Sequence, residues 1–138
     1  MYLIDTNVLS EARKRGHANR GVIRFFEKAQ ADGDALYVSV ITIGEIRRGV
    51  ELIRHRGDVQ QARRLEGWLE RILRDFEEHI LDFAHEEAQV WGHLRVPHPE
   101  NAIDKQIAAT ALTHDLTLVT RNIEHFEGLG VRTLNPFA

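Results

Sequence analysis

The chain contains no cysteine among its 138 residues. This absence excludes disulfide bonds, thiol catalysis and cysteine-ligated zinc sites, and a reducing cytoplasm is the natural compartment. No apolar run approaches the roughly 20 residues that span a bilayer. The first apolar stretch ends at Asp5 and lacks the basic-then-apolar pattern of a signal peptide. We therefore expect a cytoplasmic protein without membrane contact.

The chain also has few aromatic residues and no excess of positive charge. Aromatic residues make up 7% of the chain, the formal net charge is −3 and the isoelectric point is near 6.2. A general nucleic-acid binder is usually basic, so this balance argues against one. It does not argue against a metal-dependent nuclease, because such a site is acidic and its cation reverses the local charge. The length and the 43% hydrophobic content predict one domain over residues 1–138.

Strand-like and helix-like segments alternate along the chain. The expected strands are Tyr2–Asp5, Leu36–Ile41, His79–Phe83, Leu116–Thr120 and Val131–Leu134. The segments between them carry apolar residues at helical spacing, most clearly Leu65, Trp68, Leu69, Ile72, Leu73 and Phe76. This alternation implies right-handed crossovers and a mainly parallel sheet covered on both faces. We predict a three-layer α/β domain.

Three acidic residues lie close to the predicted strand ends. Asp5 ends the first strand, Glu45 follows the second at the start of a helix, and Asp104 lies in the first turn of another helix. Ligands of open α/β sheets bind at the carboxyl ends of the strands. Asp104 shares a helical face with Ile107 and Ala108, so it is expected to face the core rather than water. A carboxylate there is costly unless it is paired or bound to a metal.

Each acid also has a purely structural explanation. Asp5 could cap the following helix, Glu45 could form a capping box with Thr42, and Asp104 could interact with a helix dipole. Three independent structural explanations are less probable together than one shared site, because each acid follows or adjoins the carboxyl end of a strand. Hard cations such as Mg²⁺ take carboxylate oxygens and phosphate as ligands, and a cation held so can activate water against a phosphodiester. Phosphodiester hydrolysis is therefore the leading hypothesis.

The chain resembles the PIN-domain ribonucleases, specifically the VapC-type toxins of bacterial toxin–antitoxin pairs. The matching segments are Leu3–Ser10, Ser39–Gly49, Ile103–Ala111, Leu118–Asn122 and the ending Gly128–Phe137. The resemblance implies a five-stranded parallel sheet of order 3-2-1-4-5 flanked by helices. It also implies an endoribonuclease dependent on Mg²⁺ or Mn²⁺, a homodimer, an RNA substrate and inhibition by a small antitoxin.

Residue roles follow from the same resemblance. Asp5 and Asp104 match the metal ligands of the family, and Glu45 matches its third catalytic acid, which also faces the metal. The positions expected to line the site and contact substrate are Thr6, Asn7, Thr120 and Asn122.

One departure from the family pattern concerns the segment after the fourth strand. Many members carry a fourth acid there, and this chain has Asn122. Other members have Asn at that position and an acidic residue three positions later, where this chain has His125. Asn122 can ligate a metal or bind phosphate but adds no charge, which favours one metal over two. His125 could be an acid–base group or an incidental surface residue.

Two other functions are compatible with parts of the pattern. A catalytically silent PIN-fold module that binds RNA or protein would need none of the acids, and Asn122 is the one residue that favours it. A different α/β phosphohydrolase could use Asp5 as a nucleophile. Such enzymes commonly need a second acid two residues on, where this chain has Asn7, so this alternative ranks last.

Overall fold

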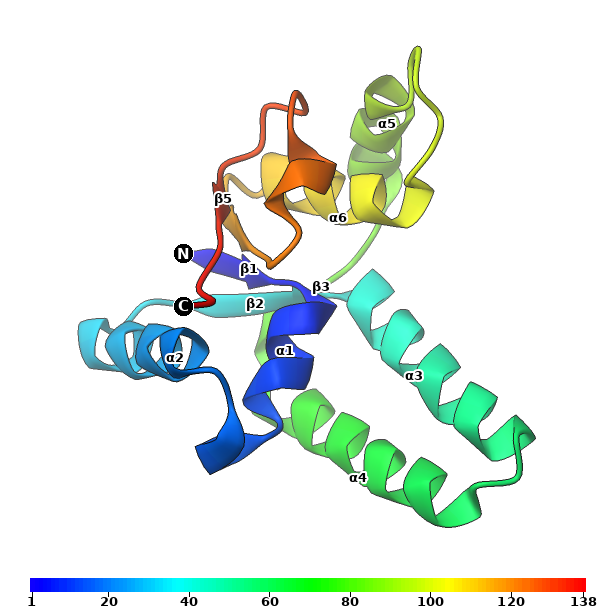
Figure 1. The fold of residues 1–138 in the computed structure, drawn as a ribbon. Helices are drawn as coiled ribbons and strands as arrows, with labels where there is room; N and C mark the ends of the chain where they lie inside the picture. Colours follow the sequence, from blue (N-terminus) through cyan, green and yellow to red (C-terminus); the bar gives the residue numbers. More distant parts are fainter.

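The computed structural model describes residues 1–138, which fold around a parallel sheet of five strands (Figure 1). The strands are β1 (Tyr2–Ile4), β2 (Leu36–Ser39), β3 (Ile80–Leu81), β4 (Thr117–Val119) and β5 (Thr133–Leu134). Their order is β3-β2-β1-β4-β5, and every neighbouring pair is parallel. The predicted fold class and the order 3-2-1-4-5 are confirmed. The sequence order reverses at β1, which places the switch point between β1 and β4.

Helices cover both faces of the sheet. They are α1 (Thr6–Ala12), α2 (Arg20–Asp32), α3 (Val40–His55), α4 (Val59–Asp75), α5 (His85–Leu94) and α6 (Ala102–Thr113), with 3₁₀ turns η1 (Arg15–His17), η2 (Glu77–His79) and η3 (Ile123–Phe126). Figure 1 shows α5 and α6 on one side of the sheet and α1 to α4 on the other. No helix combines the length and the apolar composition that crossing a membrane requires.

Strand β1 contributes to a separate core on each face of the sheet. Leu3 packs with α6 and η3, and Ile4 packs with α1 to α4, because successive strand residues point to opposite faces. Both side chains are fully buried, and each such burial contributes about 2 kcal/mol. The backbone that leads to Asp5 is therefore held from both sides.

Several predicted strand boundaries are wrong by one or two residues. The second strand was expected to reach Ile41, but it ends at Ser39, and α3 begins at Val40. The Ser39 hydroxyl accepts a hydrogen bond from the Ile41 N–H at 3.0 Å and so caps α3. This cap, with burial of Ile46 and Val50 along α3, outweighs the strand propensity of the β-branched run. The third strand shrinks to Ile80–Leu81 because His79 belongs to η2.

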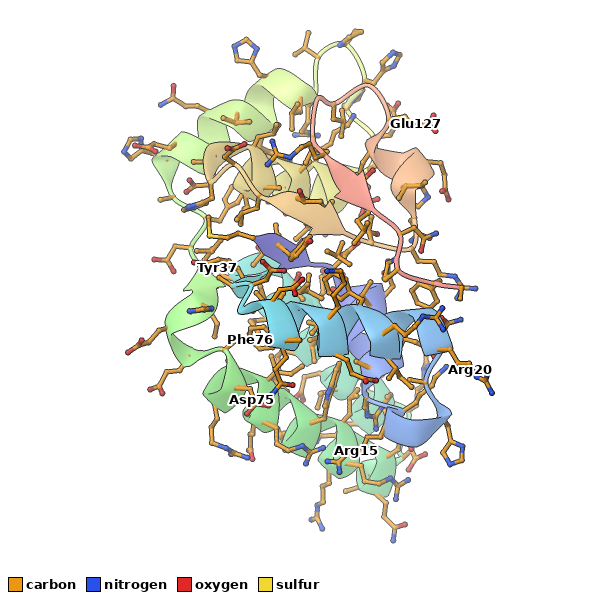
Figure 2. All side chains as sticks on the ribbon, turned by 90° about the vertical axis from the view of Figure 1, so that its left-hand side faces the viewer. Arg15, Arg20, Tyr37, Asp75, Phe76 and Glu127 are labelled. Atoms are coloured by element: carbon orange, nitrogen blue, oxygen red, sulfur yellow. The ribbon has the colours of Figure 1, made fainter.

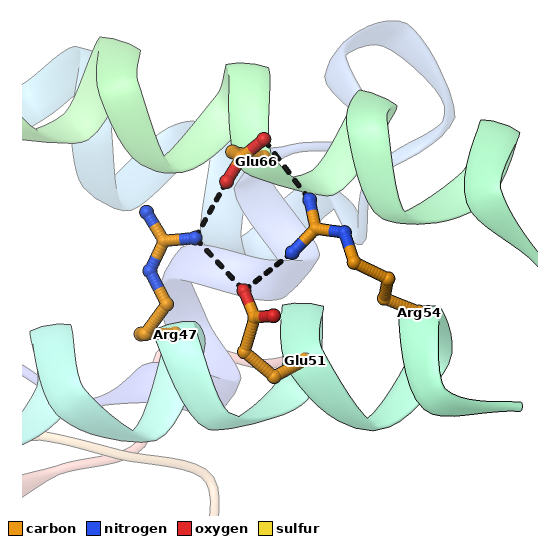
Figure 3. Close-up of polar contacts among 4 residues, drawn as sticks. All are labelled: Arg47, Glu51, Arg54 and Glu66. Carbon is orange, nitrogen blue, oxygen red and sulfur yellow. Dashed lines mark hydrogen bonds and ion pairs between the residues drawn. The ribbon is translucent and has the colours of Figure 1, made fainter.

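Helices α3 and α4 form a hairpin that four charged side chains join (Figure 3). Arg47 contacts Glu51 at 3.1 Å and Glu66 at 2.6 Å, and Arg54 contacts the same two acids at 2.5 and 3.1 Å. Hydrogen bonds from the arginines lower the pKa of Glu51 and of Glu66. Water surrounds the network and screens it, so each pair contributes little to stability. Two of its pairs, Arg47–Glu66 and Arg54–Glu66, connect α3 to α4.

The C-terminus returns to the start of α2. The Asn19 side-chain oxygen accepts from the N–H of Gly21 and from that of Ala138, each at 2.9 Å. A Cβ on Gly21 would lie 2.1 Å from the carbonyl oxygen of Pro136. Only glycine therefore fits at this crossing of backbones.

Candidate metal centre

A cavity of about 340 Å³ opens where β1 and β4 end. Ile4 is paired with Val119 in the parallel register, so Asp5 and Thr120 leave the sheet side by side. The cavity is lined by Asp5, Thr6, Asn7, Thr42, Glu45, Ile103, Asp104, Ile107 and Asn122. Six of the seven predicted site residues are in this lining, and the seventh, Thr120, is buried directly behind Asp5. The structure thus brings together residues of α1, α3 and α6 and residues that directly follow β1 and β4.

Asp5 is the most deeply placed acid of the cavity, with 8% of its surface exposed. One carboxylate oxygen accepts from the Thr6 N–H at 2.8 Å, which makes Asp5 the N-cap of α1. The other accepts from the Thr120 hydroxyl at 2.8 Å and from the Asn7 amide at 3.4 Å. The cap that we considered as an alternative is therefore real, and it coexists with a place in the cavity.

The pKa of Asp5 is raised above its ordinary value. Burial is the main cause, and the negative charge of Asp104 adds to it. Hydrogen bonds from Thr120 and Thr6 and the nearby imidazole of His125 lower the pKa and offset part of the increase. Ionised Asp5 is thus held in an environment that favours a compensating positive charge.

Asn7 and Thr120 form the frame that orients Asp5. The Asn7 amide donates to the Thr120 hydroxyl oxygen at 3.3 Å, and its carbonyl oxygen accepts from the Arg121 N–H at 3.0 Å. The Thr120 oxygen also accepts from the Asn122 N–H at 3.1 Å. These bonds tie the start of α1 to the segment after β4.

Asp104 is the third residue of α6, where the helix dipole favours a negative charge. The expectation that it faces away from water is only partly right, because 30% of its side chain is exposed at the cavity wall. The helix turns Ile107 and Ala108 fully inward and leaves Asp104 at the boundary. Its Oδ2 lies 3.0 Å from Nδ1 of His125.

Glu45 lies in the second turn of α3 and is exposed at the rim of the cavity. The capping box with Thr42 is not formed, since Ser39 caps the helix instead. The structure holds no ready-made cluster of three or more histidine, aspartate or glutamate side chains in ligand positions. The assignment of Glu45 as a third ligand beside Asp5 and Asp104 therefore stays a prediction.

Thr42 is a site residue that the sequence reasoning missed. It is 1% exposed, lines the cavity, and its hydroxyl oxygen is the one buried side-chain polar atom without a hydrogen-bond partner. An unpaired buried hydroxyl is costly, which suggests that it meets water or a ligand of the cavity. Its spacing of three residues from Glu45 on one helical face is the signal that could have found it.

The donor set of the cavity suits a hard divalent cation. Carboxylate, hydroxyl and amide oxygens dominate the lining, and no lysine or arginine is among the lining residues. Asp5 and Asp104 repel each other enough to affect the pKa of Asp5. The unpaired Thr42 hydroxyl adds an oxygen with free hydrogen-bonding capacity. The oxygen donors present therefore fit a hard divalent cation such as Mg²⁺ or Mn²⁺.

A larger hollow of about 830 Å³ lies elsewhere, among α1, α2 and α4. Its lining combines apolar side chains such as Trp68 with charged ones, and it contains none of the predicted site residues. Arg15, Asp75 and Phe76, labelled in Figure 2, belong to it. The larger size does not make this hollow the chemical centre, because none of its acidic residues is buried, whereas the smaller cavity contains the buried carboxylate of Asp5.

Comparisons with known proteins agree with the fold and identify its family. The toxin FitB of Neisseria gonorrhoeae is 34% identical, and the match covers 99% of each chain. The VapC ribonuclease Y4jK of Sinorhizobium fredii is 29% identical over 99% of this chain and 98% of its own. The crystal structure of FitAcB from Neisseria gonorrhoeae superposes with a TM-score of 0.83 at 34% identity, covering 99% of this chain and 98% of that one. The PIN domain family model matches residues 2–129, and the chain belongs to the PIN domain family.

Proposed function

We propose that this protein is a metal-dependent endoribonuclease and the toxin of a toxin–antitoxin pair. The observation that carries the proposal is the cavity at the β1–β4 switch point. There the negative charges of buried Asp5 and partly buried Asp104 repel each other, and a bound cation would relieve this repulsion. The names of its relatives, a toxin and a ribonuclease, support the same assignment. Phosphodiester hydrolysis needs such a site, because charge accumulates on the phosphate oxygens in the transition state.

The roles of the side chains follow from their positions. Asp5 and Asp104 hold Mg²⁺ or Mn²⁺, and Glu45 at the rim completes the acidic set. The bound cation supplies Lewis-acid stabilisation of phosphate charge and a more acidic water. Thr120 and Asn7 fix the orientation of Asp5 through their hydrogen bonds. Two further lining residues, Thr6 and Asn122, carry neutral donors that suit contacts to the RNA backbone.

The proposed partners are RNA, a small antitoxin and a second copy of the chain. All three come from the resemblance to VapC-type toxins, and a cytoplasmic location belongs to the same proposal. Size-exclusion chromatography with light scattering tests the homodimer: the mass of two chains supports it, and the mass of one contradicts it. Coexpression with the product of a small neighbouring reading frame tests the antitoxin, since a true antitoxin copurifies and blocks RNA cleavage.

Cleavage of RNA by the purified protein tests the activity. We expect cleavage with Mg²⁺ or Mn²⁺ and none in excess EDTA, and we expect Asp5→Asn or Asp104→Asn to abolish it while the fold persists. Asp82→Asn is the matched control, because Asp82 is an exposed acid outside the cavity. Cleavage that survives EDTA or both site substitutions would contradict the proposal. Specific RNA binding without any cleavage would favour the silent binding module instead.

A further inference from the structure

The two central acids of the cavity are held very differently. Asp5 accepts hydrogen bonds from three groups: the Thr6 N–H, the Thr120 hydroxyl and the Asn7 amide. Asp104 has one hydrogen-bond partner, the imidazole of His125, at 3.0 Å. A carboxylate on a helix surface rotates freely about its side-chain torsions unless a donor holds it. The orientation of Asp104 therefore depends on His125.

A continuous series of hydrogen bonds runs from one acid to the other. The Thr120 hydroxyl donates to Asp5, and the Asn122 N–H donates to the Thr120 oxygen. The His125 N–H then donates to the Asn122 carbonyl oxygen at 3.0 Å, and its ring contacts Asp104. The segment 120–125 thus spans the space between Asp5 and Asp104, with Thr120 at one end and His125 at the other.

The turn that carries His125 is fixed by burial. Phe126, the next residue, is 2% exposed and packs with Ile107 and Leu118 in the core on the α6 side of the sheet. η3 also lies against α6, the helix that carries Asp104. His125 therefore reaches Asp104 from a rigid neighbour, although 42% of its own side chain is exposed.

We propose that His125 is a positioning residue of the metal site, which holds Oδ2 of Asp104 and leaves Oδ1 available to the cation. This inference rests on the proposed function. An ionised carboxylate can only accept, so the proton of the hydrogen bond belongs to Nδ1 of the imidazole. Hydrogen bonds to ligating carboxylates typically change metal affinity by about 10–100-fold. If the contact between His125 and Asp104 were an incidental surface pair, its removal would change neither the metal affinity nor the stability appreciably.

Calorimetric titration with Mn²⁺ alone, on the full chain, tests the inference. His125→Phe keeps a ring of similar size and removes the donor, whereas His125→Asn keeps an N–H donor close to the position of Nδ1. We expect the phenylalanine variant to bind Mn²⁺ about 10–100-fold more weakly than the wild type, and the asparagine variant to recover most of the loss. Both variants should unfold near the wild-type midpoint, because the side chain is part-exposed.

Three results separate this inference from the proposed function. Equal Mn²⁺ affinity of His125→Phe and wild type, with binding lost in Asp104→Asn, overturns the inference alone. Absence of Mn²⁺ binding by the wild type overturns both. Nitrogen NMR of the metal-free protein gives a second readout: we expect His125 protonated at Nδ1, and a shift toward the Nε2 tautomer in Asp104→Ala. A spectrum unchanged by that substitution contradicts the hydrogen bond itself.

Discussion

The hydrogen bond from Thr120 to Asp5 should be worth more than an ordinary buried hydrogen bond. Thr120 is fully buried, and its hydroxyl donates to a carboxylate at 2.8 Å. Thr110 in α6 is a matched control, since it is equally buried but donates to the neutral carbonyl oxygen of Gln106 at 3.2 Å. Replacing each threonine with valine keeps the branched shape and removes the hydroxyl.

The expected magnitudes differ because the acceptors differ. A hydrogen bond to a charged group contributes about 1.5–3 kcal/mol to stability, and a neutral one about 0.5–1.5 kcal/mol. Thr120→Val also leaves the Asn122 N–H without its acceptor. We therefore expect Thr120→Val to lower the free energy of unfolding by about 1–2 kcal/mol more than Thr110→Val at pH 7.

Urea unfolding followed by tryptophan fluorescence measures the difference, in EDTA so that no metal contributes. The Thr120 hydrogen bond lowers the pKa of Asp5, so it stabilises the ionised form. Its contribution is complete where folded Asp5 is ionised, and it declines as the pH falls through the pKa of Asp5 in the folded protein. Equal losses for the two variants at pH 7, or an excess loss that does not shrink as Asp5 is protonated at low pH, would refute the reasoning.

Three further predictions concern charge and packing. Asp104→Asn should lower the pKa of Asp5 in a carbon NMR titration of the carboxyl groups, because a repelling charge is removed; an unchanged pKa would show that the two acids do not interact. Gly21→Ala should cost about 1–3 kcal/mol in urea unfolding because its Cβ meets backbone. In contrast, Gly67→Ala, in open space inside α4, should gain about 0.5–1 kcal/mol, and similar effects of both would refute the close approach. Glu66→Gln should lower the unfolding midpoint at neutral pH, with a loss that shrinks in 1 M salt and as acid protonates Glu66 below its lowered pKa; a salt-independent loss would contradict an ionic role.

The positions of Asp5 and Asp104 could be predicted because simple rules fix them. Asp5 comes directly after an apolar strand, and parallel strands deliver such residues to one edge of the sheet. Asp104 lies one helical turn before the buried residues of α6, which brings it to the cavity wall. Local pattern and topology therefore suffice for the backbone positions of these acids.

The details that depend on tertiary contacts could not be predicted. The start of α3 at Val40 depends on the Ser39 cap, which the β-branched run conceals. The spacing from Glu45 places Thr42 on the same helical face, but it does not show that neighbouring elements bury the Thr42 hydroxyl without a hydrogen-bond partner. The contact between His125 and Asp104 joins residues 21 positions apart through a 3₁₀ turn that carries no periodic signal. In each case the missing information is how separate segments pack.

The central claim is that Asp5 and Asp104 together hold one divalent cation. Anomalous diffraction from crystals soaked in MnCl₂ tests it most directly, because the Mn²⁺ position is located without reference to activity. The account predicts one peak in contact with carboxylate oxygens of both residues, absent from crystals of Asp104→Asn. A peak at another place, or no peak in the cavity of the wild-type protein, would contradict it.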